Sequence, residues 1–302
     1  MNEIFDKLIL RIIFALYLCG ILFFYRYAYS FLYPSVRTQM TKRFFPAKNL
    51  ADTIHLFSRV IGIGILFSQF EFLLDHGFLI ALFDFLLFAK IGIFLYIVST
   101  YLIESIVLHS FEYQDEVIKN KNVAYSIISF SHAIGVAYLI NVVLSVSKHS
   151  LTMLIFLWLF AIVLIGITTK AYSYVSKLHF NRLLIQKNIG LSLSYSGFFL
   201  GLSIIISGAL QHELIEIKWY AIHVILKTIL ALIIIPIFLK GLELIFHIQH
   251  DYNPQDQVSE SDVRDERVIG YGLYEGAIFF TSCFLTKVIT EQVLFGTFYP
   301  VL

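Results

Sequence analysis

Long apolar stretches separated by short polar connections make up almost the whole chain. A helix of about 20 apolar residues crosses the hydrocarbon core of a membrane, and eight stretches reach that length. They lie at Leu8 to Leu32, Asp52 to Leu74, Phe78 to Leu108, Val123 to Val146, Leu151 to Val175, Leu183 to Leu210, Trp219 to Phe246 and Val268 to Ile289. The pattern therefore predicts an all-α, polytopic membrane protein with eight transmembrane helices.

One phrase returns at the start of every second apolar stretch. It reads KNLADTIHLFSRVIG from Lys48, KNVAYSIISFSHAIG from Lys121, KNIGLSLSYSGFFLG from Lys187 and, more weakly, RVIGYGLYEGAIFFT from Arg267. Each copy follows one odd-numbered helix and opens one even-numbered helix. Two crossings restore the chain direction, so we expect four parallel two-helix repeats. We place them at residues 1–76 (the most divergent hairpin), 77–150, 151–211 and 212–302, the last with an acidic loop at 250–267 and a short C-terminal tail.

Small residues recur at fixed offsets within this phrase. Counted from Asn49, Asn122, Asn188 and Val268, the offsets two, nine and thirteen fall on a strip about 40° wide on a helix. The residues there that we assign to helix packing are Ala51, Ser58, Gly62, Ala124, Ser131, Gly135, Gly190, Gly197, Gly201, Gly270 and Ala277. Small residues let helix backbones approach closely in lipid. We therefore expect the even-numbered helices to pack together inside and the odd-numbered ones to face lipid.

Composition excludes several classes of protein. Of the 302 residues, 58% are hydrophobic and 14% charged, against about 25% charged in soluble domains, so a soluble domain of useful size is excluded. The net charge of +1 supports no nucleic-acid partner. No HExxH, GxSxG or Walker-type phrase occurs, so we expect neither an enzyme nor a cofactor.

Lysine and arginine predict the direction of the helices, because they concentrate in cytoplasmic loops. The loops after the odd-numbered helices hold eleven of them, and the opposite side holds three: Lys7, Lys148 and Lys218. The eleven are Arg37, Lys42, Arg43, Lys48, Lys119, Lys121, Lys177, Arg182, Lys187, Arg264 and Arg267. Both termini are therefore expected outside, with the longer loops in the cytoplasm.

The repeated phrase resembles one found in a known family. EVIKNKNVAYSII from Glu116 and LIQKNIGLSLS from Leu184 are similar to the Gly-Asn-x-Ala phrase of the YjfL-like bacterial inner-membrane proteins, domain of unknown function family 350. Lys121 and Lys187 stand where that family usually has Gly, and Val268 replaces its Asn in the last copy. The resemblance implies a bacterial inner-membrane protein with duplicated helical units and a loose link to membrane-stress systems. It implies no catalytic residue.

Ionisable residues within apolar stretches are costly in a membrane and are default candidates for a functional site. Asp84, Lys227 and Glu275 lie in three such stretches, while Arg59 and His132 share one offset of the repeated phrase. These five residues form our candidate polar pocket, and scattered structural ion pairs are the alternative. Pro236 lacks a backbone donor and is the candidate hinge of its helix. His109, His179 and His247 close odd-numbered helices, and we expect them at the membrane interface without a metal.

Two functions compete on this sequence. The first is a channel or transporter-like protein for an ion or small solute, in which the polar pocket contacts the solute. The alternative is a non-transporting membrane scaffold or stress-response partner whose cytoplasmic loops bind a peripheral protein. The lipid bilayer is the expected surrounding in both cases, and a homo-oligomer is compatible with either.

Overall fold

The computed structural model is helical throughout its described part. It describes residues 2–32, 46–68, 77–147, 150–172, 176, 178–212, 216–248, 266–291 and 293. The elements in chain order are α1 (Asn2–Leu32), η2 (Pro46–Lys48), α3 (Leu50–Phe67), α4 (Phe78–Val107), η4 (Gln114–Lys119), α5 (Val123–Val146), α6 (Leu151–Lys170), α8 (Phe180–Ile185), α9 (Ile189–Leu210), α10 (Ile217–Ile245) and α11 (Glu266–Glu291). Eight of them are long and apolar enough to cross a membrane: α1, α3, α4, α5, α6, α9, α10 and α11. The predicted all-α, eight-helix architecture is confirmed.

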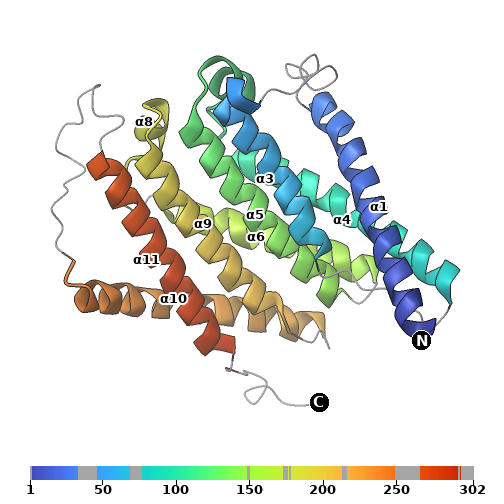
Figure 1. Cartoon of the computed structure of the whole chain (residues 1–302). Coiled ribbons are helices and arrows are strands. Elements are labelled where there is room, and N and C mark those ends of the chain that lie inside the picture. Colours follow the sequence, from blue (N-terminus) through green and yellow to red (C-terminus); the bar gives the residue numbers. More distant parts are fainter. Residues whose placement is uncertain are drawn as a thin grey trace.

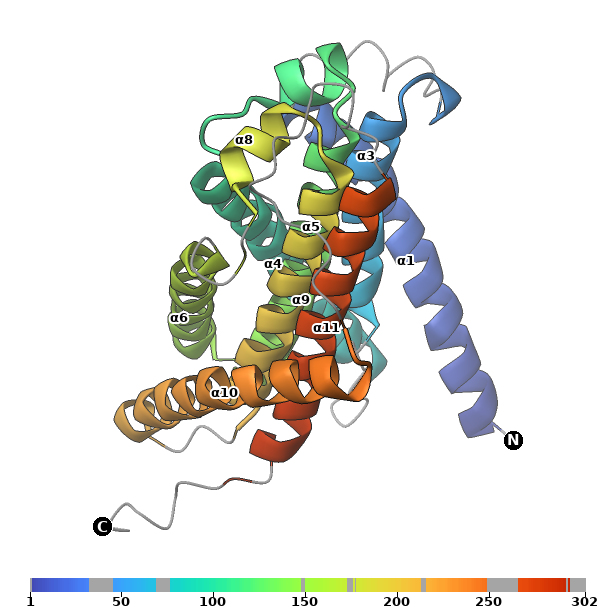
Figure 2. The same ribbon diagram turned by 90° about the vertical axis from the view of Figure 1, so that its left-hand side faces the viewer.

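The second, fourth, sixth and eighth membrane helices of the chain, which were expected to pack together, form a single row. Helices α3, α5, α9 and α11 lie side by side in that order and run in the same direction (Figure 1). Helices α4 and α6 lie on one side of the row, and α10 crosses α9 and α11 near its end (Figure 2). The inner helices are the most enclosed: 72% of the α5 span and 67% of the α9 span are buried, against 28% for α10. The repeats are parallel as expected, and they follow one another along an open row.

Three asparagines start the helices of this row. Asn49, Asn122 and Asn188 have extended backbones, and each side-chain oxygen accepts a hydrogen bond from the backbone N–H three residues further on. The first N–H groups of a helix have no partner within the helix, so this cap satisfies one of them. The repeated Lys-Asn phrase is therefore the start signal of α3, α5 and α9.

Two of these asparagines also join neighbouring repeats. The amide Nδ2 of Asn49 donates to the carbonyl of Val117, just before α5, at 2.8 Å. The amide of Asn122 donates in the same way to the carbonyl of Leu184, just before α9, at 3.1 Å. The same amide donates to Glu116 at 2.7 Å. One side chain thus caps its own helix and holds the loop of the next repeat.

The residue before each later asparagine forces a sharp change of direction. Lys121 has φ 49° and Lys187 has φ 57°. Both values lie in the left-handed region, which residues other than glycine adopt only at a cost in free energy. This turn separates α8 from α9. Our prediction of one continuous helix from Leu183 to Leu210 is therefore wrong, because the cap at Asn188 starts a new helix.

Glycine contacts hold the row together at most of the predicted small positions. A Cβ built on Gly190 or Gly197 would collide with the α11 backbone, and one on Gly135 would collide with Phe199 and Ser203 of α9. On Gly201 it would meet Cys283 of α11, and on Gly62 it would meet Tyr96 of α4. The remaining small positions of the first two copies are buried: Ala51, Ser58, Ala124 and Ser131.

The fourth copy departs from this stripe. Gly270 has no atom within 4 Å of its built Cβ, and Ala277 is exposed. The contact of α11 with α9 is made instead by Gly272 and Gly276, which lie four residues apart on one helix face. The prediction was wrong at Gly270 and Ala277, because α11 packs against α9 through the face that carries Gly272 and Gly276.

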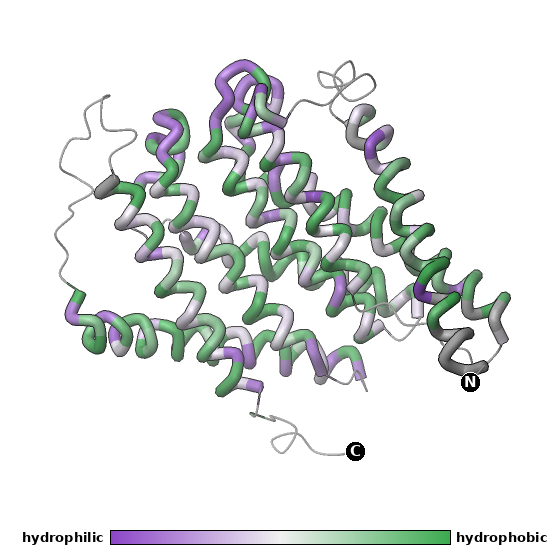
Figure 3. Tube along the Cα trace, in the orientation of Figure 1, coloured by the Kyte–Doolittle hydropathy of each residue, from purple (hydrophilic) through white to green (hydrophobic). Residues whose placement is uncertain are grey.

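Polar residues gather toward the two ends of the row, with apolar helix between them (Figure 3). This distribution is the one expected of helices whose middle parts lie in hydrocarbon. Most of the predicted acidic loop and the C-terminal tail lie outside the described residues, as do Lys42, Lys148 and Lys177.

Candidate functional site

A buried ion pair lies where α3, α4 and α5 meet. Nη2 of Arg59 on α3 is 2.5 Å from Oε1 of Glu104 on α4, and it donates to Oγ of Ser129 on α5 at 2.9 Å. The Ser129 hydroxyl in turn donates to the same carboxylate. The side chains of Arg59 and Glu104 are only 4% and 9% exposed. Removing one partner of such a pair leaves an uncompensated buried charge, which costs about 3–5 kcal/mol.

The backbone of α3 holds the guanidinium in place. Nη1 of Arg59 donates to the carbonyl of His55 at 2.6 Å and to Oγ of Ser58 at 3.2 Å. The Tyr96 hydroxyl donates to the carbonyl of Arg59 itself at 3.4 Å. A planar guanidinium donates in fixed directions, so these contacts fix its orientation toward Glu104.

His132 extends the polar contacts from α5 to α9. Its Nε2 lies 3.0 Å from the hydroxyl of Tyr195, and its ring packs edge-on against Phe199 at 4.6 Å between centroids. The His132 side chain is fully buried, and Nδ1 has no hydrogen-bond partner. The His132–Tyr195 contact therefore joins α5 to α9.

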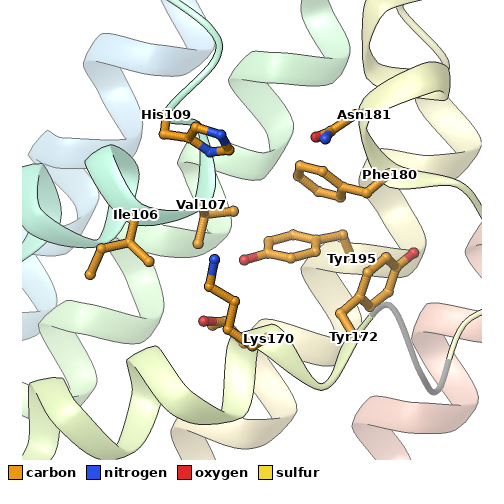
Figure 4. A pocket seen from close by; sticks show the side chains of 9 residues that line it. Ile106, Val107, His109, Lys170, Tyr172, Phe180, Asn181 and Tyr195 are labelled. Carbon is orange, nitrogen blue, oxygen red and sulfur yellow. The ribbon is translucent and has the colours of Figure 1, made fainter.

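A pocket adjoins Tyr195 at the ends of α4 and α6 (Figure 4). Its volume is about 190 Å³. The lining residues are Ile106, Val107, His109, Thr169, Lys170, Tyr172, Phe180, Asn181 and Tyr195. In this view the ammonium of Lys170 and the hydroxyl of Tyr195 face each other, with His109 and Asn181 at the opposite wall.

The five residues predicted to form one polar pocket do not meet. Asp84 is exposed on α4, and Lys227 of α10 contacts Nε2 of His212 at 2.7 Å. Glu275 of α11 accepts hydrogen bonds from Ser194 and Ser176. Only Arg59 and His132 share one region. The predicted common pocket is wrong because its members lie on five different helices, α3, α4, α5, α10 and α11, and the two ends of the open row do not approach each other.

Pro236 lies within α10 and is exposed, and its role as a hinge stays a prediction. Of the histidines expected at the interface, His109 lines the pocket, while His179 at the start of α8 and His247 in the turn after α10 are exposed. Among the described residues, no three His, Cys, Asp or Glu side chains are grouped as a metal site would require.

Three residues of the observed site were not among the residues predicted to form it. Glu104, Ser129 and Tyr195 are ordinary members of apolar helices, and the partner of Arg59 is 45 residues away. A signal was present for Glu104, since a second buried charge of opposite sign near the same end is the simplest partner for Arg59. Tyr195 carried no such signal.

Comparison with known proteins places the chain in a family. Two segments, residues 3–144 and 146–289, match the family described as Domain of Unknown Function (DUF350). Each segment contains two of the helical hairpins, so the family unit is a pair of hairpins. No curated protein and no solved structure matches the chain. The chain therefore belongs to the DUF350 family, as a multi-pass membrane protein that carries two tandem copies of its unit.

Proposed function

We propose that this protein is a transporter-like membrane protein for an ion or small solute, with Arg59 and Glu104 as its charged centre. The supporting observation is the buried Arg59–Glu104–Ser129 cluster between three membrane helices. An ionisable pair in this setting is costly and marks solute pathways in membrane proteins. A solute ion that binds one partner competes with the other, so the pair is a natural site for coupled binding and release.

An open channel fits less well than a carrier. The parallel repeats follow one another in a row, whereas a pore along a repeat axis needs the last repeat to close on the first. The charged centre is instead packed between α3, α4 and α5. A carrier needs no permanent lumen, only a site that is exposed alternately to each side.

Flux into liposomes tests this proposal. Purified protein is reconstituted, and ion flux is followed under several gradients and potentials. Glu104→Gln is expected to abolish flux, whereas Asp84→Asn, an exposed carboxyl on the same helix, is expected to leave it unchanged. Because Glu104→Gln also removes an ion-pair partner, the double variant Arg59→Met, Glu104→Leu is included. It removes both charges at little net cost in stability, so it should be folded and inactive.

The second candidate is a non-transporting, non-enzymatic scaffold. Its favouring observation is that the charged centre is internally satisfied, as in a purely structural pair. The cytoplasmic loops, including the acidic segment at residues 250–267, would then bind a peripheral protein. Under this alternative the wild-type protein gives no flux above empty liposomes, and the double variant behaves as wild type in partner binding.

We further propose a bacterial inner-membrane location with both termini outside. The ends of α4 and α9 provide described positions for labelling. In a chain whose two native cysteines have been replaced, Gln211→Cys should react with an impermeant maleimide on intact cells, and Ser110→Cys only after permeabilisation. The reverse labelling pattern would show that the topology is inverted, with both termini in the cytoplasm.

A further inference from the structure

The pocket at the ends of α4 and α6 contains hydrogen-bond donors, and none of the described residues in its lining is a carboxylate. Lys170 contributes an ammonium group, Asn181 an amide and His109 an imidazole, while Ile106 and Phe180 supply apolar walls (Figure 4). A site of this composition favours a small anion carried on an apolar body. Its volume of about 190 Å³ is that of roughly six water molecules at about 30 Å³ each, which suits a tetrahedral oxyanion.

The protonation of His132, which contacts the Tyr195 hydroxyl, determines whether that hydroxyl can donate a hydrogen bond into the pocket. If Nε2 of His132 accepted the Tyr195 proton, Nδ1 would carry a buried N–H with no acceptor, because it has no partner. If Nε2–H instead donates to the Tyr195 oxygen, Nδ1 is left as a bare lone pair. That arrangement is the less costly one. The Tyr195 hydroxyl proton is then available to the pocket, opposite the Lys170 ammonium.

The pocket also lies at the right level for a membrane amphiphile. Its walls are the last residues of the spans that end at Val107 and Lys170, where polar head groups meet hydrocarbon. Lysine at such a position holds its ammonium at the interface.

We propose that this pocket binds a phosphate monoester, with Lys170 and Tyr195 as the two donors that hold its oxygens. The same chemistry is offered by the head group of phosphatidic acid and by free phosphate compounds. The assignment is independent of the transport proposed above, because binding is measurable whether or not anything crosses the membrane.

Binding is tested on the full chain in a neutral detergent with two probes, short-chain phosphatidic acid and inorganic phosphate. The readouts are the dissociation constant by calorimetry and the shift of the melting temperature. Lys170→Gln and Tyr195→Phe should each weaken binding about tenfold, since each removes one charge-assisted hydrogen bond. Lys240→Gln, an exposed lysine on α10 away from the pocket lining, is the matched control and should bind as wild type.

Each outcome decides the proposal. Saturable binding of phosphatidic acid with much weaker binding of phosphate identifies a lipid head-group site. Equal binding of both probes identifies a site for soluble phosphate compounds. No binding of either probe, or binding that survives in Lys170→Gln, overturns the proposal. Lys170 is exposed, so its variant stays informative even if Tyr195→Phe fails to fold.

Discussion

Replacing Asn122 tests whether its side chain stabilises the contact between neighbouring repeats in addition to capping α5. Its side chain is fully buried and makes three hydrogen bonds: it accepts from Tyr125 N at 3.2 Å, and it donates to Leu184 O and to Glu116. Asn122→Ala removes all three. Loss of the cap costs about 1 kcal/mol, and loss of the two donated hydrogen bonds costs about 0.5–1.5 kcal/mol each, since the Leu184 carbonyl keeps the backbone N–H of Lys187 at 3.0 Å. The expected loss of unfolding free energy is therefore about 2–4 kcal/mol.

A matched variant isolates the joining bond. Ser150 caps α6 by accepting a hydrogen bond from Met153 N at 3.5 Å, and it is exposed. Ser150→Ala should cost about 0.5–1 kcal/mol, since it removes a weak cap alone. Both variants are measured by denaturant unfolding in mixed micelles and by thermal melting in detergent. Equal losses for Asn122→Ala and Ser150→Ala would refute the view that the asparagine joins the repeats.

Three further changes test other parts of the fold, all by unfolding in detergent. Lys121→Gly should stabilise the protein by up to about 1 kcal/mol, because it relieves a left-handed backbone; a loss of stability would contradict this. Gly197→Ala should destabilise by about 1–3 kcal/mol, since its Cβ meets the α11 backbone, whereas Gly64→Ala has open space and should be neutral or slightly stabilising. Burial and the Lys227 charge lower the pKa of His212 from 6.5 to about 4, so the unfolded chain takes up a proton in that window and the folded chain does not. Stability should then fall by about 1 kcal/mol, after allowance for solvent screening, as the pH drops from 6.5 to 4, and His212→Gln should flatten that slope.

The parts of the fold that repeat were predictable from sequence, and the parts that depend on single long-range contacts were not. Val123 to Val146 was predicted with the observed bounds of α5, because a clear start phrase and a long apolar run agree. The break before Asn188 was missed because the residues on both sides of it are apolar and fit one continuous helix. The turn is evident only from the positive φ of Lys187. The partner of Arg59 was missed for a different reason. Glu104 lies on α4, the third membrane helix, which carries no repeated phrase, so the repeat does not relate Glu104 to Arg59.

The asparagine bonds also bear on how many hairpins a protein of this design contains. A ring closes only at one copy number, but a row whose neighbours meet through the same kind of contact has no such condition. The first junction uses Asn49 and the Val117 carbonyl, and the second uses Asn122 and the Leu184 carbonyl, while α9 and α11 meet through glycine contacts. The fourth copy has Val268 at the position of these asparagines, and a valine side chain cannot donate the corresponding hydrogen bond. Duplication of a hairpin therefore meets no condition of ring closure in such a row.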